Sequence, residues 1–468
     1  MPCFYVAVNP IMRPKITTEV SALWQLTWPL LIGQLANVGM GVVDVAMAGH
    51  ASGEDLAGIS LGVSIWNMLI ITLMGLMMSV NPMVSHYVGA EQFDRVPHVV
   101  RQGLWKALGV GLIAMLVSIL AAQVFNYMEL EPAVREIAQG FVIITSFAMP
   151  AFTCYRVLYG YSTSLNQTKP LMVIALAALG LNVIINGLLV FGLAGFPKLG
   201  GLGCAWATLV CVWFNLLVLV WWMRRSPAYQ STRPFTHFEA PHPAKLRSMF
   251  KLGTPIGVTY FAESSAFSLI ALFVARFGST EVAAHQIALS FTSMVFMVPL
   301  SLGVALLTRV GQSLGANDPA EARFRAWVGV GVSMVFAIAS ATGMAVFNHQ
   351  IASAYTNDVA IAALAAQLLF LAAIFQLSDS AQVVTSCAIR GYKVTKAPMV
   401  LHLTAFWLVS LPLGCVLGWA PAWLPWQPAA PMGAQGFWIG LIVGLTVAAI
   451  GLLALLRWVS LQKLHDTH

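Results

Sequence analysis

Long apolar stretches, interrupted by short polar segments, recur along the whole chain. A helix rises about 1.5 Å per residue, so roughly 20 apolar residues cross the hydrocarbon core of a bilayer. Because each stretch exceeds this length and the connections are short, the pattern predicts about twelve membrane-spanning helices. We expect these spans at residues 20–48, 55–83, 98–122, 136–160, 169–193, 201–223, 250–275, 282–308, 325–348, 359–388, 397–418 and 436–458.

The composition supports an all-α integral membrane protein. Of the 468 residues, 59% are hydrophobic and 9% are charged, whereas soluble domains carry about 25% charged residues. Lysine and arginine concentrate at the termini and in the connections after even-numbered spans, with Arg135, Lys198 and Arg276 as exceptions. The positive-inside rule therefore places both termini in the cytoplasm. The net charge of +7 reflects this topology, so we expect contact with the lipid bilayer and no nucleic-acid partner.

The chain contains an internal repeat. Pro29 in LTWPLLIGQL aligns with Pro255 in LGTPIGVTYF, and the same offset of 226 residues carries Gly89 onto Gly315. Each half holds six spans, an even number, so both halves insert in the same orientation and form parallel repeats. The sequence predicts an N-terminal tail (1–19), an N-terminal half (20–223), a cytoplasmic linker (224–249), a C-terminal half (250–458) and a C-terminal tail (459–468).

Three acidic residues fall inside predicted spans: Asp44, Glu263 and Asp379. Each costs roughly 2.5–3.5 kcal/mol at the centre of a membrane helix, so we expect them to face the bundle interior or a wet cavity. At the repeat offset, Glu263 falls on Asn37 and Asp44 falls on Ile270. Because the acidic groups do not follow the repeat, function is favoured over a scaffold role, although a protonated packing residue is the alternative.

Polar residues accompany these acids at helical spacing, which places them on shared faces. The stripes are Gln34, Asn37 and Asp44; Asn182 and Asn186; Tyr260, Glu263 and Phe267; and Gln376 and Asp379. Such stripes supply the oxygen ligands that hard cations prefer. The asparagines have a second interpretation, because interhelical amide hydrogen bonds also stabilise membrane bundles.

No motif indicates an enzyme. The chain contains no GxxxxGK[ST] phosphate loop, no HExxH and no nucleophile elbow, and His402 stands alone in its span. No basic residue is centred in a span. We expect neither a cofactor nor an ATPase subunit, because an ion gradient needs only carboxylates.

Several segments together resemble the MATE family of multidrug and toxic compound extrusion antiporters, most closely its NorM branch. They are PLLIGQLANVGMGVVDVAMAGH, YFAESSAF, FQLSDSAQ and RGYKVTKAPM. The resemblance implies two six-helix lobes around a central cavity that opens alternately to either side. It implies export of cationic or amphipathic drugs in exchange for Na⁺ or H⁺, in the bacterial inner membrane, and we expect a monomer.

Site residues follow from the resemblance by position. Glu263 and Asp379 match the cation-site carboxylates of the C-terminal lobe, and the coupling cation is the one metal ion expected. Asp44, Asn182 and Asn186 match an acidic site for a proton or cation in the N-terminal lobe. The drug contacts expected from the resemblance are Gln34, Asn37, Ser64, Phe267, Gln286 and Asp358.

The chain departs from some relatives in the coordination shell. Phe375 and Phe296 stand where those relatives have a tyrosine, and a phenyl ring offers no oxygen. Tyr260, one turn from Glu263, is the expected substitute. Three rival interpretations stay open: a lipid-linked glycan flippase of related fold, which calls for basic cavity residues, an integral-membrane enzyme and a passive channel.

Overall fold

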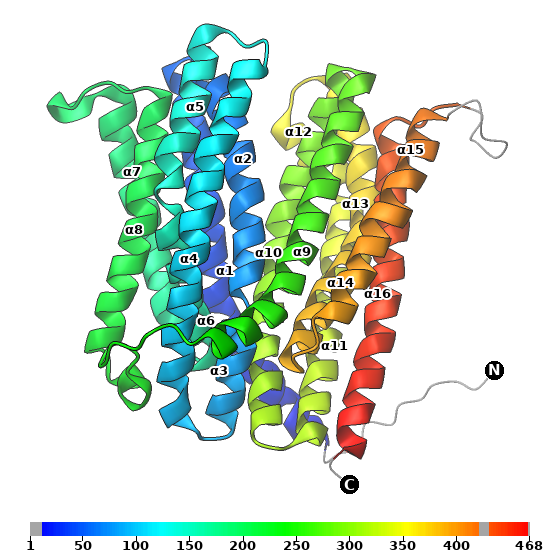
Figure 1. Cartoon of the computed structure of the whole chain (residues 1–468). Helices are drawn as coiled ribbons and strands as arrows, with labels where there is room; N and C mark the ends of the chain where they lie inside the picture. Colours follow the sequence, from blue (N-terminus) through cyan, green and yellow to red (C-terminus); the bar gives the residue numbers. More distant parts are fainter. Residues whose placement is uncertain (1–11, 421–429, 467–468) are drawn as a thin grey trace, which may run out of the picture.

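The computed structural model describes residues 12–420 and 430–466, and every regular element in this part of the chain is helical (Figure 1). Expectations for the tail residues 1–11 and 467–468 lie outside the described residues. Eleven helical stretches are long and apolar enough to cross a membrane, and a pair bent by 47° makes a twelfth. The predicted all-α membrane fold is therefore confirmed.

The first half contains eight α-helices. They are α1 (Met12–Ala51), α2 (Gly53–Met77), α3 (Val80–Gly89), α4 (Val96–Ala122), α5 (Pro132–Ser146), α6 (Met149–Ser164), α7 (Lys169–Phe191) and α8 (Gly201–Arg225). Short 3₁₀ turns connect or extend them: η1 (Phe93–Arg95), η2 (Gln123–Tyr127) and η3 (Leu193–Gly195). The helix α1 begins inside the segment predicted as a tail.

The second half repeats this arrangement after the 3₁₀ turn η4 (Pro227–Thr232). Its helices are α9 (Pro243–Val274), α10 (Ser279–Gly315), α11 (Pro319–Val346), α12 (Asn348–Tyr355), α13 (Val359–Gly391), α14 (Lys396–Leu403), α15 (Leu411–Trp419) and α16 (Ala434–His465). The 3₁₀ turn η5 (Ala275–Phe277) follows α9, and the π-helix η6 (Thr404–Ser410) joins α14 to α15.

Two predicted spans are broken where a proline removes a backbone donor. Proline has no N–H, so the carbonyl four residues earlier loses its helical partner. Pro82 frees the carbonyl of Met78, where α2 ends and α3 begins, and Pro150 frees that of Ser146, at the bend between α5 and α6. The hydropathy pattern alone gave continuous spans at both places.

The helices before the linker gather on one side of the molecule and those after it on the other, which forms two lobes (Figure 1). The first turns of α1 and the last turns of α16 lie at the same end of the bundle. Contacts between the lobes join α1 and α3 to α10, and α2 to α9. We call the end where α3 crosses α10 the closed end.

Two glycines related by the sequence repeat form the crossing at the closed end. A Cβ atom on Gly89 would lie 1.9 Å from the backbone oxygen of Gln312, and one on Gly315 would lie 2.1 Å from the backbone oxygen of His86. His86 and Gln312 are themselves repeat mates, so the contact is pseudo-symmetric. Only glycine permits this approach of the two backbones.

A buried ion pair reinforces the closed end. Glu19 on α1 is 4% exposed and pairs with Arg309 on α10, whose Nε donates to its carboxylate at 2.5 Å. Arg325 lies 3.5 Å from the same carboxylate. Nearby, the hydroxyl of Thr308 on α10 donates to the side-chain oxygen of Asn81 on α3 at 3.2 Å. Polar groups that would be costly in lipid therefore tie the two lobes together.

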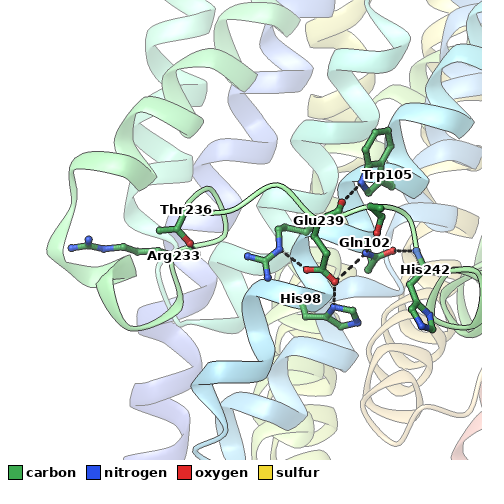
Figure 2. A network of polar contacts seen from close by, with 9 residues as sticks. His98, Gln102, Trp105, Arg233, Thr236, Glu239 and His242 are labelled. Carbon is green, nitrogen blue, oxygen red and sulfur yellow. Dashed lines mark hydrogen bonds and ion pairs between the residues drawn. The ribbon is translucent and has the colours of Figure 1, made fainter.

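The linker between the lobes is held against the N-terminal lobe. Figure 2 shows Glu239 of the linker beside His98 of α4, with which it forms a hydrogen bond. The Nε of Arg101, also on α4, donates to the other carboxylate oxygen of Glu239 at 2.7 Å. The side chain of Gln102 donates to the carbonyl of Ala240 and accepts from the backbone of His242. Because His242 immediately precedes α9, these contacts fix the start of the second lobe against α4.

The same contacts shift the pKa of Glu239. Partial desolvation opposes ionisation, but hydrogen bonds and charges from Arg101 and His98 outweigh it and hold the pKa of Glu239 below its usual value. A carboxylate with a lowered pKa in the folded state contributes stability above its usual pKa and loses it as the pH falls.

Replacing Gly89 with alanine should force α3 and α10 apart, because the obstructing atom belongs to the backbone and cannot rotate away. We expect a loss of about 1–3 kcal/mol of stability, typical of overpacking, seen as a lower melting temperature in detergent. Gly109→Ala is the control, since no heavy atom lies within 4 Å of its Cβ position. Equal melting temperatures for the two variants would contradict this packing.

Replacing Glu239 with glutamine should lower the melting temperature at neutral pH, because the contact to Arg101 loses its charge. The difference in melting temperature between wild type and variant should shrink as the pH falls below about 4.3, the usual pKa of a glutamate carboxyl. It should vanish once the pH has passed the lowered pKa of Glu239 in the folded protein. Melting curves of both proteins across the acidic range test this. A gap that persists unchanged after acidification would show that Glu239 is not the titrating group.

Candidate functional site

Asp44 on α1 is 6% exposed and receives hydrogen bonds from two neighbouring helices. The amide nitrogens of Asn182 and Asn186 on α7 donate to its Oδ1 at 3.0 and 2.6 Å, and Thr208 on α8 donates to its Oδ2 at 3.1 Å. The structure therefore brings Asp44, Asn182 and Asn186 together. Sequence reasoning missed Thr208, because an isolated threonine in an apolar span carries no distinguishing pattern.

A cavity of about 280 Å³ extends from this cluster within the N-terminal lobe. Asn37 and Gln34, about two and three turns before Asp44 on the polar face of α1, line it together with Asp44 and Asn182. Arg156 of α6 also lines it, and its guanidinium stacks over Tyr159 at 4.4 Å from the ring centre.

A second cavity of about 490 Å³ lies between the lobes. Tyr260 and Glu263 of α9 and Asp379 of α13 line it, opposite residues of α2. Asn67 and Met74 of α2 line both cavities, so the two spaces adjoin along this helix. The structure thus places all three predicted cation-site residues on one cavity at the lobe interface.

The two carboxylates of this cavity have few protein partners. Among the described residues, Glu263 makes no hydrogen bond or ion pair, and Asp379, 3% exposed, accepts one hydrogen bond from Gln382 at 3.2 Å. Carboxylates at membrane depth need a compensating charge or a proton. Two of them facing one cavity can supply oxygen ligands to a hard cation such as Na⁺.

Tyr260 is 9% exposed, and its hydroxyl is already engaged. It accepts a hydrogen bond from the Nη1 of Arg390 at 3.3 Å and donates to the sulfur of Met78 at 3.7 Å. Tyr260 therefore shares the cavity with the carboxylates, but its hydroxyl is shared with a guanidinium. Phe296 and Phe375 also line the cavity and offer no oxygen.

Of the predicted drug contacts, Gln34 and Asn37 line the cavity of the N-terminal lobe, and the other four divide into two groups. Ser64 and Phe267 line the cavity between the lobes, and Phe267 packs edge-on against Phe375. Gln286 is exposed on α10 and is not among the residues that line this cavity. Asp358 caps α13, where its Oδ1 accepts from the backbone nitrogens of Ala360 and Ile361.

Three basic residues that were counted with the cytoplasmic connections lie within helices. Lys106 and Arg156 fall in the predicted spans 98–122 and 136–160, and Arg390 lies just beyond the predicted span 359–388. Arg390 on α13 is 4% exposed, and Arg156 lines the N-lobe cavity. Lys106 on α4 is 2% exposed, and its ammonium donates to the carbonyl of Leu76 at 2.7 Å and to the hydroxyl of Ser79 at 2.9 Å. It thereby satisfies groups freed by the break between α2 and α3.

Sequence reasoning missed the contacts that His402 makes with a neighbouring helix. His402 on α14 is 1% exposed and forms a hydrogen bond with Gln382 of α13, which in turn contacts Asp379. The two spans that carry these residues are consecutive, but nothing in the sequence fixes which of their faces meet. The sequence did contain a signal for this contact: His402 lies in an apolar span, and Gln382 lies one turn from Asp379.

A family model described as MatE matches residues 29–188 and 255–416. The two matches begin at Pro29 and Pro255, the prolines that the internal repeat aligns. The chain belongs to the MatE family. Both lobes therefore carry the family pattern, as the parallel repeat predicts.

Curated bacterial proteins of this family resemble the chain along most of its length. The multidrug resistance protein PmpM of Pseudomonas aeruginosa is 40% identical over 93% of this chain and 91% of its own. A probable multidrug resistance protein NorM of Chromobacterium violaceum is 37% identical over 98% of each chain. The multidrug resistance protein NorM of Vibrio cholerae is 38% identical over 95% of this chain and 96% of its own.

Solved structures support the two-lobe fold. The eukaryotic MATE transporter AtDTX14 superposes with a TM-score of 0.85, at 19% identity, over 97% of this chain and all of the other. An outward-facing multidrug resistance MATE family transporter of the MOP superfamily superposes with a TM-score of 0.84, at 17% identity, over 94% and 96% of the two chains. At this identity the likeness establishes the fold alone.

Replacing Asp44 with alanine should destabilise the N-terminal lobe, because two buried amides and the half-buried hydroxyl of Thr208 lose their acceptor. Each buried donor left unsatisfied costs about 1–3 kcal/mol. Thr208→Val removes one of the same hydrogen bonds and should lower the melting temperature less. Thermal unfolding in detergent ranks the two variants. Equal effects would mean that Asn182 and Asn186 do not depend on Asp44.

Proposed function

We propose that this protein is a secondary-active multidrug efflux antiporter of the bacterial inner membrane. It exports cationic or amphipathic drugs in exchange for Na⁺ or H⁺ and works by alternating access, as a monomer with both termini in the cytoplasm. Glu263 and Asp379 bind the coupling cation, and Asp44 with Asn182 and Asn186 forms the second acidic site. The proposal includes no cofactor and no ATPase subunit.

The observation that carries this proposal is the pair of carboxylates on the cavity between the lobes. The lining of that cavity contains Glu263 and Asp379 and, among the described residues, no lysine or arginine. Apolar side chains such as Met68, Phe267 and Phe296 make up most of the rest. A negative, largely apolar and aromatic cavity suits an amphipathic cation, which aromatic faces also attract.

Competition for negative charge provides the coupling. When a small cation binds Glu263 and Asp379, it removes the charge that favours a drug cation in the same cavity. By linkage, a drug must then weaken the binding of the small cation by the same factor. Influx of the ion down its gradient can therefore drive release of the drug to the outside.

The closed end supports alternating access. The crossing of Gly89 and Gly315 and the ion pair of Glu19 with Arg309 join the lobes at one end, and the cavity with the carboxylates lies farther along the interface. Opening towards the closed end requires these contacts to break together. Such an arrangement has two discrete states, which an antiporter needs and a passive channel does not.

Relatives support the choice of drugs as substrates. The curated relatives reported above are named as multidrug resistance proteins, at 37–40% identity. A MOP superfamily transporter of the same fold from Pyrococcus furiosus is described as having a binding pocket of reverse polarity that suggests a different function. Here the cavity between the lobes is acidic, which disfavours the rival flippase, although Arg156 places one basic group in the adjoining cavity.

Drug efflux from proteoliposomes, with Na⁺ and H⁺ gradients imposed separately, tests the proposal. We expect at least one gradient to drive efflux in the wild type. Glu263→Gln should reduce this efflux at least about tenfold, because the neutral amide lacks the negative charge that binds the cation. Glu54→Gln is the matched control, since Glu54 is exposed in the first turn of α2.

The possible outcomes separate the ion and the site. Efflux driven by Na⁺ alone and lost in Glu263→Gln would identify Na⁺ as the ion bound at this carboxylate. Efflux driven by H⁺ and unaffected by Glu263→Gln would move the coupling to Asp44. Efflux that neither gradient drives would contradict the antiporter proposal.

A further inference from the structure

A third pocket, of about 420 Å³, lies where the two lobes meet at the closed end. Tyr87 of α3, two residues before the crossing at Gly89, lines it from the N-terminal lobe. The C-terminal lobe contributes residues of α9 and of the turn that joins α13 to α14. The pocket shares no lining residue with the cavities that hold Glu263, Asp379 and Asp44.

Positive charge gathers at this pocket without a counter-charge from the protein. Among the described residues, three lysines and no acidic residue line it: Lys251, Lys393 and Lys396. None of their ammonium groups forms an ion pair or a hydrogen bond within the described part of the chain. The ammonium of Lys245 lies 5.4 Å from the ring centre of Tyr87. Partial desolvation and the charge of Lys245 lower the pKa of Lys393, which a bound anion would counteract.

Two hydroxyl groups of the pocket also lack a partner. Thr395 is 6% exposed, and its side chain makes no hydrogen bond among the described residues, even to the helix α14 that follows it. The first backbone N–H groups of a helix have no partner within that helix. The hydroxyl of Tyr87 likewise has no hydrogen-bond partner in the described ranges. Ammonium groups, hydroxyls and a helix N-terminus together are the donors that bind a phosphate.

The internal repeat shows that the scaffold does not require this charge. The turn KVTKAPMV (393–400) corresponds to NQTKPLMV (166–173) in the N-terminal lobe, so Lys393 corresponds to Asn166. Both residues have left-handed backbone, with φ of 60° and 59°, and asparagine adopts this conformation more readily than lysine does. Asn166 accepts a hydrogen bond from Gln312 of the opposite lobe at 3.3 Å. The positive-inside rule explains lysines on this side of the membrane, but not their convergence on one pocket.

The surroundings of the pocket suit a lipid. Lys396 is the first residue of the span Lys396–Trp419, which places the pocket at the depth of the lipid headgroups. Phe250, next to Lys251 on α9, is exposed, and so is Val400, one turn after Lys396 on α14. Exposed apolar side chains on membrane helices contact acyl chains. A lipid can therefore place its headgroup in the pocket and its chains along these helices.

We infer that this pocket binds a phosphate group, and that the headgroup of an anionic phospholipid supplies it. The three lysines balance the negative charge, and the hydroxyls of Thr395 and Tyr87 donate hydrogen bonds to the phosphate oxygens. Because Tyr87 belongs to the N-terminal lobe and the lysines belong to the C-terminal lobe, a bound headgroup joins the lobes at the closed end. The inference does not depend on which ion drives transport.

Thermal unfolding of the full chain in a neutral detergent, titrated with dioctanoyl phosphatidylglycerol, measures binding. Dioctanoyl phosphatidylcholine and inorganic phosphate are the comparison ligands. We expect phosphatidylglycerol to raise the melting temperature more than phosphatidylcholine, because its headgroup has a net negative charge. Replacing both Lys393 and Lys396 with glutamine should weaken its binding about 25-fold, since each lysine near an anionic lipid contributes about fivefold.

The matched control replaces Lys15 and Lys169 with glutamine. This variant loses the same charge, both lysines are exposed, Lys169 is the repeat mate of Lys396, and neither control residue lines the pocket. It should bind phosphatidylglycerol as the wild type does. Tyr87→Phe, which removes one hydroxyl and keeps the ring, should weaken binding about threefold or more.

The outcomes separate the site from its ligand. Binding of phosphatidylglycerol that is weakened in the lysine variant and kept in its control supports the inference. Equal affinities of these two variants would overturn it, and so would equal responses to phosphatidylglycerol and phosphatidylcholine. If inorganic phosphate alone produces the full effect, and the lysine variant loses it, the phosphate site stands and its assignment to a lipid fails. An unchanged affinity in Tyr87→Phe would contradict the contribution of the N-terminal lobe.

Discussion

A carboxylate cannot remain in the apolar interior of a membrane without a compensating proton, donor or cation, and the chain satisfies this constraint in a different way at each acidic site. Asp44 receives three hydrogen bonds from neutral donors. Asp379 receives one, from Gln382. Glu263 has no partner among the described residues and faces the cavity between the lobes. The site with the least compensation from the protein is the one that a cation from solution can complete.

The helical scaffold follows the internal repeat, whereas the acidic residues of the site depart from it. The crossing of Gly89 and Gly315 uses the same position in each half, so the closed end is symmetric. The acidic groups are not: Asp44 has no acidic mate in the second half, and Glu263 has none in the first. Symmetry in the helices supports a rocking motion of two similar lobes, while asymmetry in the charges gives each lobe a separate chemical task.

Hydropathy is a local property, so the sequence sufficed for the twelve spans. The grouping of Asp44 with Asn182 and Asn186 joins two helices and was expected from the resemblance to the MATE family. Depth in the membrane was less predictable. Arg390 was placed just beyond a span and Lys106 was counted with the cytoplasmic side, since a basic residue near a span end cannot be placed without the length and tilt of its helix. Contacts between helices were least predictable: the link from His402 to Gln382 depends on how two spans rotate against each other. Packing decides that rotation, and no local pattern encodes it.

The central claim is that a drug and a small cation compete for the charge of Glu263 and Asp379. It is tested most directly by measuring drug affinity with and without the coupling cation, and cation affinity with and without drug, on purified protein. The account predicts that each ligand weakens the other by the same factor, and that this factor approaches one in Glu263→Gln. A wild-type drug affinity that responds to neither Na⁺ nor pH would contradict it.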